Sequence, residues 1–172
     1  PFKAYLNLDK TLTGVWIVAF VSSIDTNGPV LKRLGAGALI GLTTFLIVGG
    51  IAMALGVVRF DPKLHEAAWL WSINNILLVC FAEEAFFRGY LQAGLSRLLH
   101  GRRHADAIAI LAISLVFGFV HFGQPLSMQL LSVMAGIGYG LAYLRHGLIG
   151  AIAAHATLNL CHFFLLTYPL LE

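Results

Sequence analysis

Two adjacent carboxylates and an arginine stand in the apolar stretch FAEEAFFRGY, residues 81–90. At about 100° per residue in a helix, Glu84 and Arg88 lie nearly on the same face, four residues apart, and can form an ion pair. Glu83 points about 140° away from Arg88 and is left as a free carboxylate. A free carboxylate can act as a general base. The alternative for all three residues is a buried ion-pair network that only fixes helix packing.

A histidine follows in the apolar stretch FGFVHFG, residues 117–123. The basic turn around Arg102 lies 19 residues after Glu83 and 19 residues before His121. Two antiparallel helices joined at that turn would hold Glu83 and His121 at about the same depth. A carboxylate next to an imidazole can position and deprotonate a water molecule. The alternative is that His121 is a packing residue.

The stretch HATLN, residues 155–159, holds His155 and Asn159 on one helical face. Both side chains can donate hydrogen bonds to an oxyanion that develops on an attacked carbonyl group. The alternative is a hydrogen-bonded pair between helices. His162, nearer the end of the same apolar segment, is predicted to be a packing residue.

The composition indicates an integral membrane protein. Of 172 residues, 59% are hydrophobic and 11% are charged, and the mean hydropathy is +0.84. A soluble domain has roughly 25% charged residues. The net charge of +3 comes from few charges and does not indicate binding to nucleic acid. Each charged group at mid-membrane costs about 2.5–3.5 kcal/mol, so charged residues there are candidates for function.

An all-α transmembrane bundle must position these residues, because helices satisfy their own backbone polar groups in lipid. One domain is predicted over residues 1–172, with a motif-bearing core at about 67–168. Gly136, Gly138 and Gly140 are expected to let helices pack closely around the site. About six apolar segments are predicted to span the bilayer: Leu12–Ile24, which is short, Leu34–Val58, Ala67–Leu95, Ala105–Phe122, Met128–Leu144 and Leu148–Tyr168.

Flanking residues support this arrangement of spans. Trp69 and Trp71, near the start of the third segment, are typical of an interfacial aromatic belt. Six of the Lys and Arg residues fall in loops opposite the termini and four on the side of the termini, which favours cytoplasmic odd-numbered loops. The polar, basic turn at residues 94–106 is expected to project beyond the bilayer core.

Taken in order, the three polar stretches resemble the motifs of one protein family. EEAFFR fits EExxxR, FGFVH fits FxxxH and HATLN fits HxxxN, each in a separate apolar segment. Over about residues 69–164 the chain resembles the CAAX prenyl protease and bacteriocin-processing family, also called CPBP or Abi. It is shorter than an eight-span eukaryotic CAAX protease and is more similar to the compact prokaryotic branch. The resemblance therefore implies a protein of the prokaryotic cell membrane.

The resemblance also implies an activity and its residues. It implies an intramembrane endopeptidase that uses a glutamate and neither a metal nor another cofactor. The expected partners are the lipid bilayer and a peptide or protein substrate in or at the membrane. Neither the substrate's identity and prenylation nor the oligomeric state follows from the sequence. Carried over position by position, the motifs assign water activation to Glu83 and His121, the oxyanion hole to His155 and Asn159, and structural support to Glu84 and Arg88.

Three other functions fit the same residues. A zinc metalloprotease would use Glu83, Glu84, His121 and His155 as ligands, although the HExxH motif is absent. A non-enzymatic immunity or scaffold protein would use the polar network for structure only. A transporter would use mid-membrane charges, but the sequence lacks pseudo-symmetric broken spans.

Overall fold

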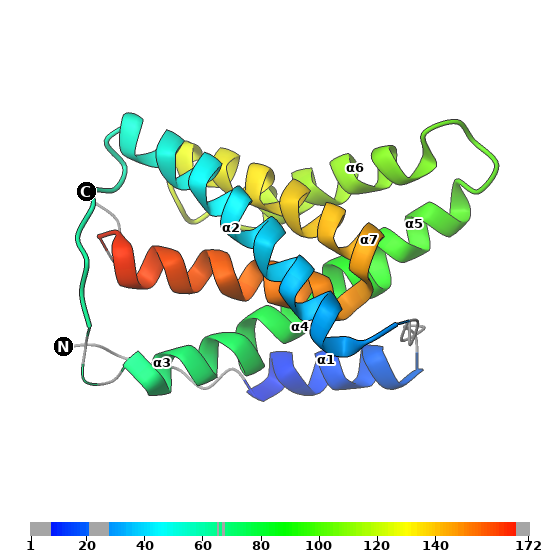
Figure 1. Cartoon of the computed structure of the whole chain (residues 1–172). Coiled ribbons are helices and arrows are strands. Elements are labelled where there is room, and N and C mark those ends of the chain that lie inside the picture. The colour runs from blue at the N-terminus through cyan, green and yellow to red at the C-terminus, as the bar shows by residue number, and fades with distance from the viewer. Residues whose placement is uncertain (1–7, 21–27, 65, 67, 168–172) are drawn as a thin grey trace.

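Helices account for most of the residues that the structure describes (Figure 1). The computed structural model describes residues 8–20, 28–64, 66 and 68–167. Within these residues, the extended structure is an isolated bridge between Phe60 and Leu166. The helices are α1 (Leu8–Phe20), α2 (Val30–Ala54), α3 (Ala68–Asn74), η1 (Asn75–Cys80), α4 (Phe81–Glu84), η2 (Ala85–Gln92), α5 (Ala93–Leu98), α6 (Ala105–Phe119) and α7 (Leu126–Leu165).

Three helices are long and apolar enough to cross a membrane. They are Val30–Ala54, the continuous run Ala68–Leu98 from α3 to α5, and Leu126–Leu165. These helices support the prediction of an integral, all-helical membrane protein, whereas the count of six spans is not established by them. Of the first predicted span, residues 21–24 lie outside the described residues.

α6 is shorter than its predicted span. The segment was expected to run from Ala105 to Phe122, but the helix ends at Phe119. Its 15 residues rise about 22 Å, less than the ~30 Å hydrocarbon core. The last residues tighten instead into i→i+3 turns, in which the amide of His121 donates to the carbonyl of Gly118 at 3.1 Å.

α7 consists of two helical segments that meet at Gly147. This residue has φ 65° and ψ −165°, a backbone conformation that favours glycine. The chain reverses direction there, so that segments 126–146 and 148–165 run opposite ways (Figure 1). The bend falls where the sequence predicts a turn between the fifth and sixth spans. Arg33 of α2, which is buried, donates from Nε to the carbonyl of His146 at 2.9 Å and so caps the first segment.

α2 crosses α7 with its backbone in direct contact. A Cβ atom built on Gly37 would collide with the backbone of Gly150, and one on Gly41 would lie 2.7 Å from Cα of Ala154. Small residues spaced four apart on both helices therefore permit this crossing. The contact fixes the position of the helix that carries His155.

The glycines of the first α7 segment make similar contacts with three helices. Gly136 lies against Ser114 of α6, Gly138 lies against Thr44 of α2, and Gly140 lies against Gln92 of η2. Close packing around these glycines agrees with the expectation from the sequence. The main cluster of buried apolar residues lies between the same helices and includes Phe45, Phe87, Phe117, Leu131 and Tyr139.

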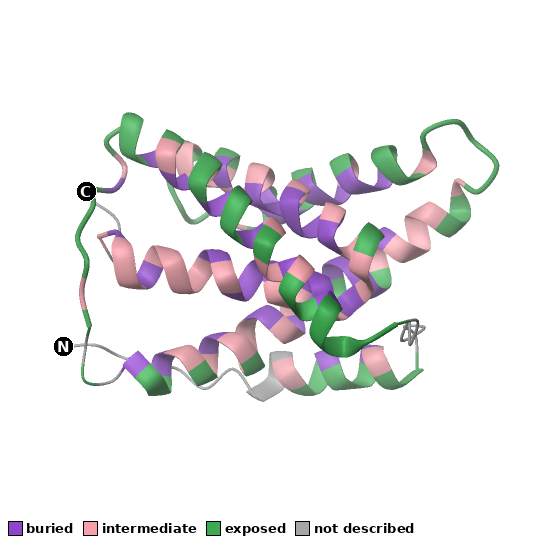
Figure 2. Ribbon diagram, in the orientation of Figure 1, coloured by how far each residue is buried: buried purple, intermediate pink, exposed green. Residues whose placement is uncertain are grey.

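Apolar side chains also cover the outside of the bundle. Figure 2 shows buried residues facing the centre and exposed residues on the outer faces of α2, α6 and the run α3–α5. Leu39 and Leu46 of α2 and Leu115 of α6 are each more than half exposed. A contiguous apolar surface of this kind is expected for side chains that face lipid.

The two tryptophans of the third predicted span have different environments. Trp69 is 66% exposed, as expected for an interfacial residue, but Trp71 is buried. The Trp71 ring stacks on Phe163 with centroids 3.9 Å apart, so it joins α3 to the end of α7. The interfacial role expected of Trp71 is therefore wrong, because its side chain packs inside the bundle.

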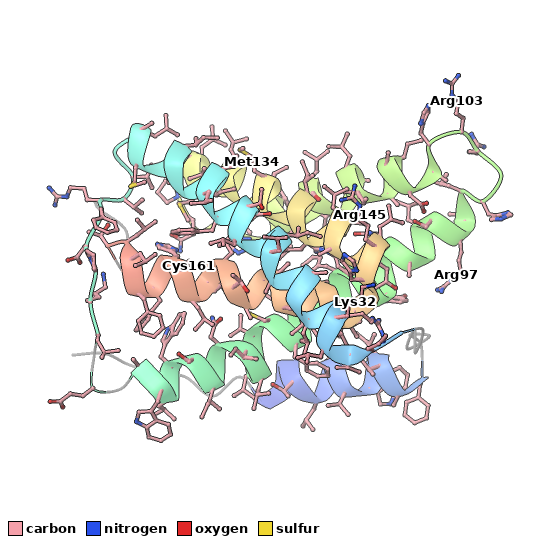
Figure 3. The ribbon with its side chains drawn as sticks, in the orientation of Figure 1. Lys32, Arg97, Arg103, Met134, Arg145 and Cys161 are labelled. Carbon is pink, nitrogen blue, oxygen red and sulfur yellow. The ribbon has the colours of Figure 1, made fainter. Side chains whose placement is uncertain are left out.

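The hairpin between α5 and α6 extends beyond the other helices (Figure 1). Figure 3 shows Arg97 and Arg103 pointing away from the bundle there, and both are exposed. The polar tip therefore extends past the rest of the bundle, whereas its projection beyond the bilayer core remains a prediction. At the other end of α7, residues 59–63 run antiparallel to residues 164–167, and the amide of Asp61 donates to the carbonyl of Leu165 at 2.8 Å.

Candidate active site

A line of polar side chains runs along the inner face of the helical run α3–α5. Glu84, Arg88 and Gln92 follow one another at intervals of four residues, which keeps them on nearly the same face. Asn75 and Cys80 are five apart, and η1 is π-helical with i→i+5 hydrogen bonds, so these two also share a face. All five are at most 8% exposed. The π-helical segment η1 thus adds Asn75 and Cys80 to the polar line formed by Glu84, Arg88 and Gln92.

α7 supplies partners for this polar line from both of its segments. Residues of the line contact two side chains of the second segment and two backbone carbonyl groups of the first. The carbonyl groups belong to glycines that allow a close approach. The contacts are Asn75 with Asn159 at 3.2 Å, Glu84 with His155 at 2.8 Å, Arg88 with the carbonyl of Gly136 at 3.1 Å, and Gln92 with the carbonyl of Gly140 at 3.1 Å.

Glu84 lies between two basic groups. Its Oε2 is 3.2 Å from Nε of Arg88, which is the ion pair that the spacing predicts. Its Oε1 is 2.8 Å from Nδ1 of His155, a contact across 71 positions of the chain. Both side chains of the Glu84–Arg88 pair are fully buried. Removing one partner of a buried ion pair leaves the other charge uncompensated. Glu84 and Arg88 therefore stabilise the fold as a pair.

Aromatic rings surround the guanidinium of Arg88. The group lies 5.0 Å from the ring centre of Phe117, 5.6 Å from that of Tyr139 and 5.8 Å from that of Phe87. Rings at these distances attract a cation through their negative faces. Arg88 therefore joins η2, α6 and α7 and fits a supporting position in the site.

His155 is held on one edge and one face. Its Nδ1–H donates to Glu84, which leaves Nε2 as the nitrogen available for other contacts. The ring stacks on Tyr139 with centroids 4.4 Å apart and an angle of 13° between planes. His155 is 4% exposed. Two side chains therefore fix its orientation before any substrate binds.

Asn159 contacts two residues of η1. Its Nδ2–H donates to Oδ1 of Asn75 at 3.2 Å and lies 3.7 Å from Sγ of Cys80. The Cys80 thiol donates in turn to the same oxygen of Asn75 at 3.3 Å. These contacts join the start of the helical run to the second segment of α7.

His121 lies two residues beyond the end of α6, in a turn rather than inside a helical span. The helix tightens before Pro125 and the chain turns into α7, so the expected position of His121 within a helix is wrong. Its Nδ1–H donates to the carbonyl of Phe117 at 2.7 Å. This bond sets the tautomer in which Nε2 carries a lone pair and can accept a proton.

Glu83 differs from its neighbour Glu84 in burial and in hydrogen bonding. Its side chain is half-buried, and it forms no hydrogen bond or ion pair with the residues that the structure describes. The ion pair of Arg88 is with Glu84, which agrees with the prediction that Glu83 does not pair with Arg88. Glu83 is therefore a carboxylate without a structural partner in this part of the chain.

One cavity of about 220 Å³ brings together four of the residues selected from the sequence. Glu83, His121, His155 and Asn159 all line it. They come from the run α3–α5, the turn after α6 and the second segment of α7. Most of the remaining wall is apolar and includes Val79, Phe117, Met128, Leu131 and Leu158.

A second cavity of about 460 Å³ lies on the α1 side of the same residues. Glu83 and His121 line this cavity as well, together with Thr13, Ala82, Phe86, Phe87 and Val120. The carboxylate and the imidazole are therefore shared between the two cavities. This shared position is the feature that distinguishes Glu83 and His121 from His155 and Asn159.

Residues 65–161 match the family model of the type II CAAX prenyl endopeptidase Rce1-like proteins. The match covers more than half of the chain. This chain belongs to the Rce1-like family. No curated protein and no solved structure matches the chain.

Membership of the Rce1-like family agrees with the apolar helices and with the resemblance seen in the three motifs. The protein is an integral membrane protein of the CAAX protease type, a hydrolase family that acts on peptide substrates at the membrane. The matched region begins just before α3 and ends within α7, so it contains the whole polar line and also Glu83, His121, His155 and Asn159. The parts of the cavity walls that come from α1, α2 and the end of α7 lie outside it.

Several residues around this Rce1-like site are not among those selected from the sequence. Asn75 and Gln92 extend the polar line, and Tyr139 supports His155. His162, predicted to be a packing residue, also lines the smaller cavity. Asn75 and Gln92 could have been noticed as polar residues in an apolar segment, whereas a tyrosine in an apolar helix carries no such signal.

The ligand set of the zinc alternative is divided in the structure. Glu84 is engaged by Arg88 and His155, and it does not line either cavity. Among the described residues, no group of three or more His, Cys, Asp or Glu is placed to hold a metal ion.

Proposed function

We propose that this protein is a glutamate-type intramembrane endopeptidase. The observation that carries the proposal is the single cavity lined by Glu83, His121, His155 and Asn159. A carboxylate and an imidazole with a free Nε2 provide a base for water, and two further side chains provide hydrogen-bond donors. Family membership supports peptide hydrolysis as the reaction.

In the proposed first step, Glu83 and His121 hold a water molecule between them. Nε2 of His121 accepts one hydrogen bond from the water, because Nδ1–H is bound to the carbonyl of Phe117. Glu83 removes a proton while the water oxygen attacks the substrate carbonyl carbon, and the carbonyl π electrons move to oxygen. Base catalysis of this kind contributes about 10²–10⁴-fold to a rate.

The negative oxygen of the tetrahedral intermediate then requires donors. Nδ2–H of Asn159 supplies one. Nε2–H of the protonated His155 ring supplies another, and Glu84 stabilises that imidazolium through Nδ1–H. Glu83 finally passes its proton to the leaving amine as the C–N bond breaks, which returns the carboxylate to its ionised form.

We further propose that all six apolar segments cross a prokaryotic cell membrane. The reversal at Gly147 supports two passes by α7, and the projecting hairpin between α5 and α6 supports a turn outside the bilayer core (Figure 1). The short helices α1 and α6 would cross with help from the adjoining turns and from local thinning of the bilayer.

The proposal is tested by terminal proteomics of membranes from cells that express wild type or Glu83→Gln. Termini that appear only with wild type identify cleavage sites. A quenched fluorescent peptide that spans one such site, called the reporter peptide below, then gives kcat and KM for the purified protein in liposomes. Glu83→Gln should lower kcat by about 10²–10⁴-fold.

The matched control is Glu66→Gln, the same chemical change at an exposed position outside both cavities. It should cleave the reporter peptide at the wild-type rate. Equal cleavage by Glu83→Gln, or the absence of any terminus that depends on wild type, would overturn the proposal and favour a scaffold protein.

A further inference from the structure

We propose that Asn75 is a positioning residue that fixes the amide of Asn159 for hydrogen bonding to the reacting carbonyl oxygen. The inference rests on the proposed function, because it concerns the donor that Asn159 provides there. Asn75 lines neither cavity, so it would act through Asn159 and not on the substrate.

The hydrogen bonds around Asn75 orient the amide of Asn159. Oδ1 of Asn75 accepts from Nδ2–H of Asn159 and from the thiol of Cys80. A rotation of the Asn159 amide by 180° would place its oxygen against this acceptor and exchange an attraction for a repulsion. Because Asn75 is 8% exposed, little water is available to compensate for that loss.

The same three atoms show which N–H bond of Asn159 is used. The distances of 3.2 Å, 3.7 Å and 3.3 Å fix the angle Asn75 Oδ1–Asn159 Nδ2–Cys80 Sγ at about 57°. The two N–H bonds of a planar amide diverge by about 120°. When one N–H points at Oδ1 of Asn75, the direction to Sγ of Cys80 therefore lies about 57° from that N–H and at least about 63° from the other, so the sulfur is aligned with neither bond.

With one N–H of Asn159 aimed at Asn75, the second N–H has no well-aligned acceptor among the residues that the structure describes, because the Cys80 sulfur is the other atom bonded to this nitrogen and lies at 3.7 Å. Asn159 is half-buried and lines the smaller cavity together with His155. The bond to Asn75 thus holds one N–H and leaves the other as the donor for the oxyanion. A fixed donor is more effective than a rotating one, because no reorganisation is needed during the reaction.

The π-helical geometry of η1 makes this contact available. On a regular α-helix, Asn75 would lie about 180° from Glu84, on the opposite face. The wider turn of η1 places Asn75 in line with Cys80, which is 3.3 Å from it, and hence opposite Asn159. π-Helical turns occur frequently at functional sites.

Asn75→Leu and Asn75→Asp test the inference with the reporter peptide. Leucine removes the acceptor, so kcat should fall about 10–100-fold while KM stays within twofold. Aspartic acid keeps an acceptor oxygen in the same place and should restore at least a third of the wild-type kcat. Asn74→Leu, one residue earlier and outside both cavities, controls for the effect of an apolar residue in this helix.

A double-mutant cycle separates positioning from a purely structural role. If Asn75 acts through Asn159, Asn75→Leu should lower kcat no further in the background of Asn159→Ala. Additive losses, a kcat of Asn75→Leu within twofold of wild type, or no recovery in Asn75→Asp would each overturn the inference. If Asn75→Leu fails to fold, Asn75→Asp is compared directly with wild type. A tenfold loss of kcat in Asn75→Asp would then overturn the inference.

Glu83→Gln is measured in the same series. If Glu83→Gln is inactive and Asn75→Leu is not impaired, the positioning role fails while the proposed function stands. If Glu83→Gln retains activity, the proposed function itself fails.

Discussion

Oε1 of Glu84 accepts a 2.8 Å hydrogen bond from Nδ1 of His155, and Oε2 of the same carboxylate faces Nε of Arg88 at 3.2 Å. One fully buried carboxylate therefore joins the EExxxR and HxxxN stretches. It ties the orientation of a proposed oxyanion donor to the ion pair that holds the helices together.

Glu84→Gln should impair both stability and activity. The substitution leaves the buried charge of Arg88 without its partner, which costs about 3–5 kcal/mol, and it removes the charge that stabilises a protonated His155. We expect a lower midpoint of thermal unfolding in detergent and a kcat at least tenfold below wild type. Glu83→Gln should unfold within about 2 °C of wild type, because Glu83 has no hydrogen bond to the described residues; a larger shift would contradict its assignment as a free carboxylate.

His121→Ala should lower kcat by about 10²-fold or more with little change in stability. The imidazole lies in a turn and donates a hydrogen bond to the carbonyl of Phe117, so its loss removes a base and few packing contacts. The reporter peptide measures the rate, and His100→Ala, at an exposed position, is the matched control. Normal cleavage by His121→Ala would restrict water activation to Glu83.

Gly41→Ala should destabilise the bundle, whereas Gly50→Ala on the same helix should not. The added Cβ at Gly41 would lie 2.7 Å from Cα of Ala154, beside His155, but at Gly50 it would have no atom within 4 Å. Alanine at Gly50 should even stabilise α2, by up to about 1 kcal/mol from helix propensity. Thermal unfolding of both variants measures the difference, and equal midpoints would contradict the backbone contact between α2 and α7.

Chelation should leave cleavage of the reporter peptide unchanged. Glu84, one of the ligands that a zinc site would need, is bound between Arg88 and His155. We expect kcat within twofold of its untreated value after incubation with phenanthroline. Inhibition that added zinc reverses would establish the metalloprotease alternative.

Cysteine labelling tests the number of spans. Arg103→Cys lies at the exposed tip between α5 and α6, and Gln124→Cys lies in the exposed turn between α6 and α7. If α6 crosses the bilayer, a membrane-impermeant maleimide should label the two positions from opposite faces of oriented vesicles. Wild type, with Cys80 buried and Cys161 half-buried, gives the background. Labelling of both from one face would show that α6 does not cross.

Local regularities of the sequence were enough to predict the class of protein and much of the site. The apolar composition indicates membrane helices, and the spacing of Glu84 and Arg88 predicts their ion pair, because residues four apart on a helix are always neighbours. The same geometry predicts that Arg88 does not pair with Glu83. The residues Arg145, His146 and Gly147 likewise predict the turn before Leu148.

Contacts between distant segments could be decided only by the tertiary structure. Glu84 and His155 are 71 positions apart, and no periodicity relates them. The position of Asn75 depends on a π-helical turn that moves it across the helix from the face that a regular wheel assigns. His121 lies in a turn because α6 ends early. Helical periodicity is a local property of the backbone, whereas these three relationships arise from how separate helices pack.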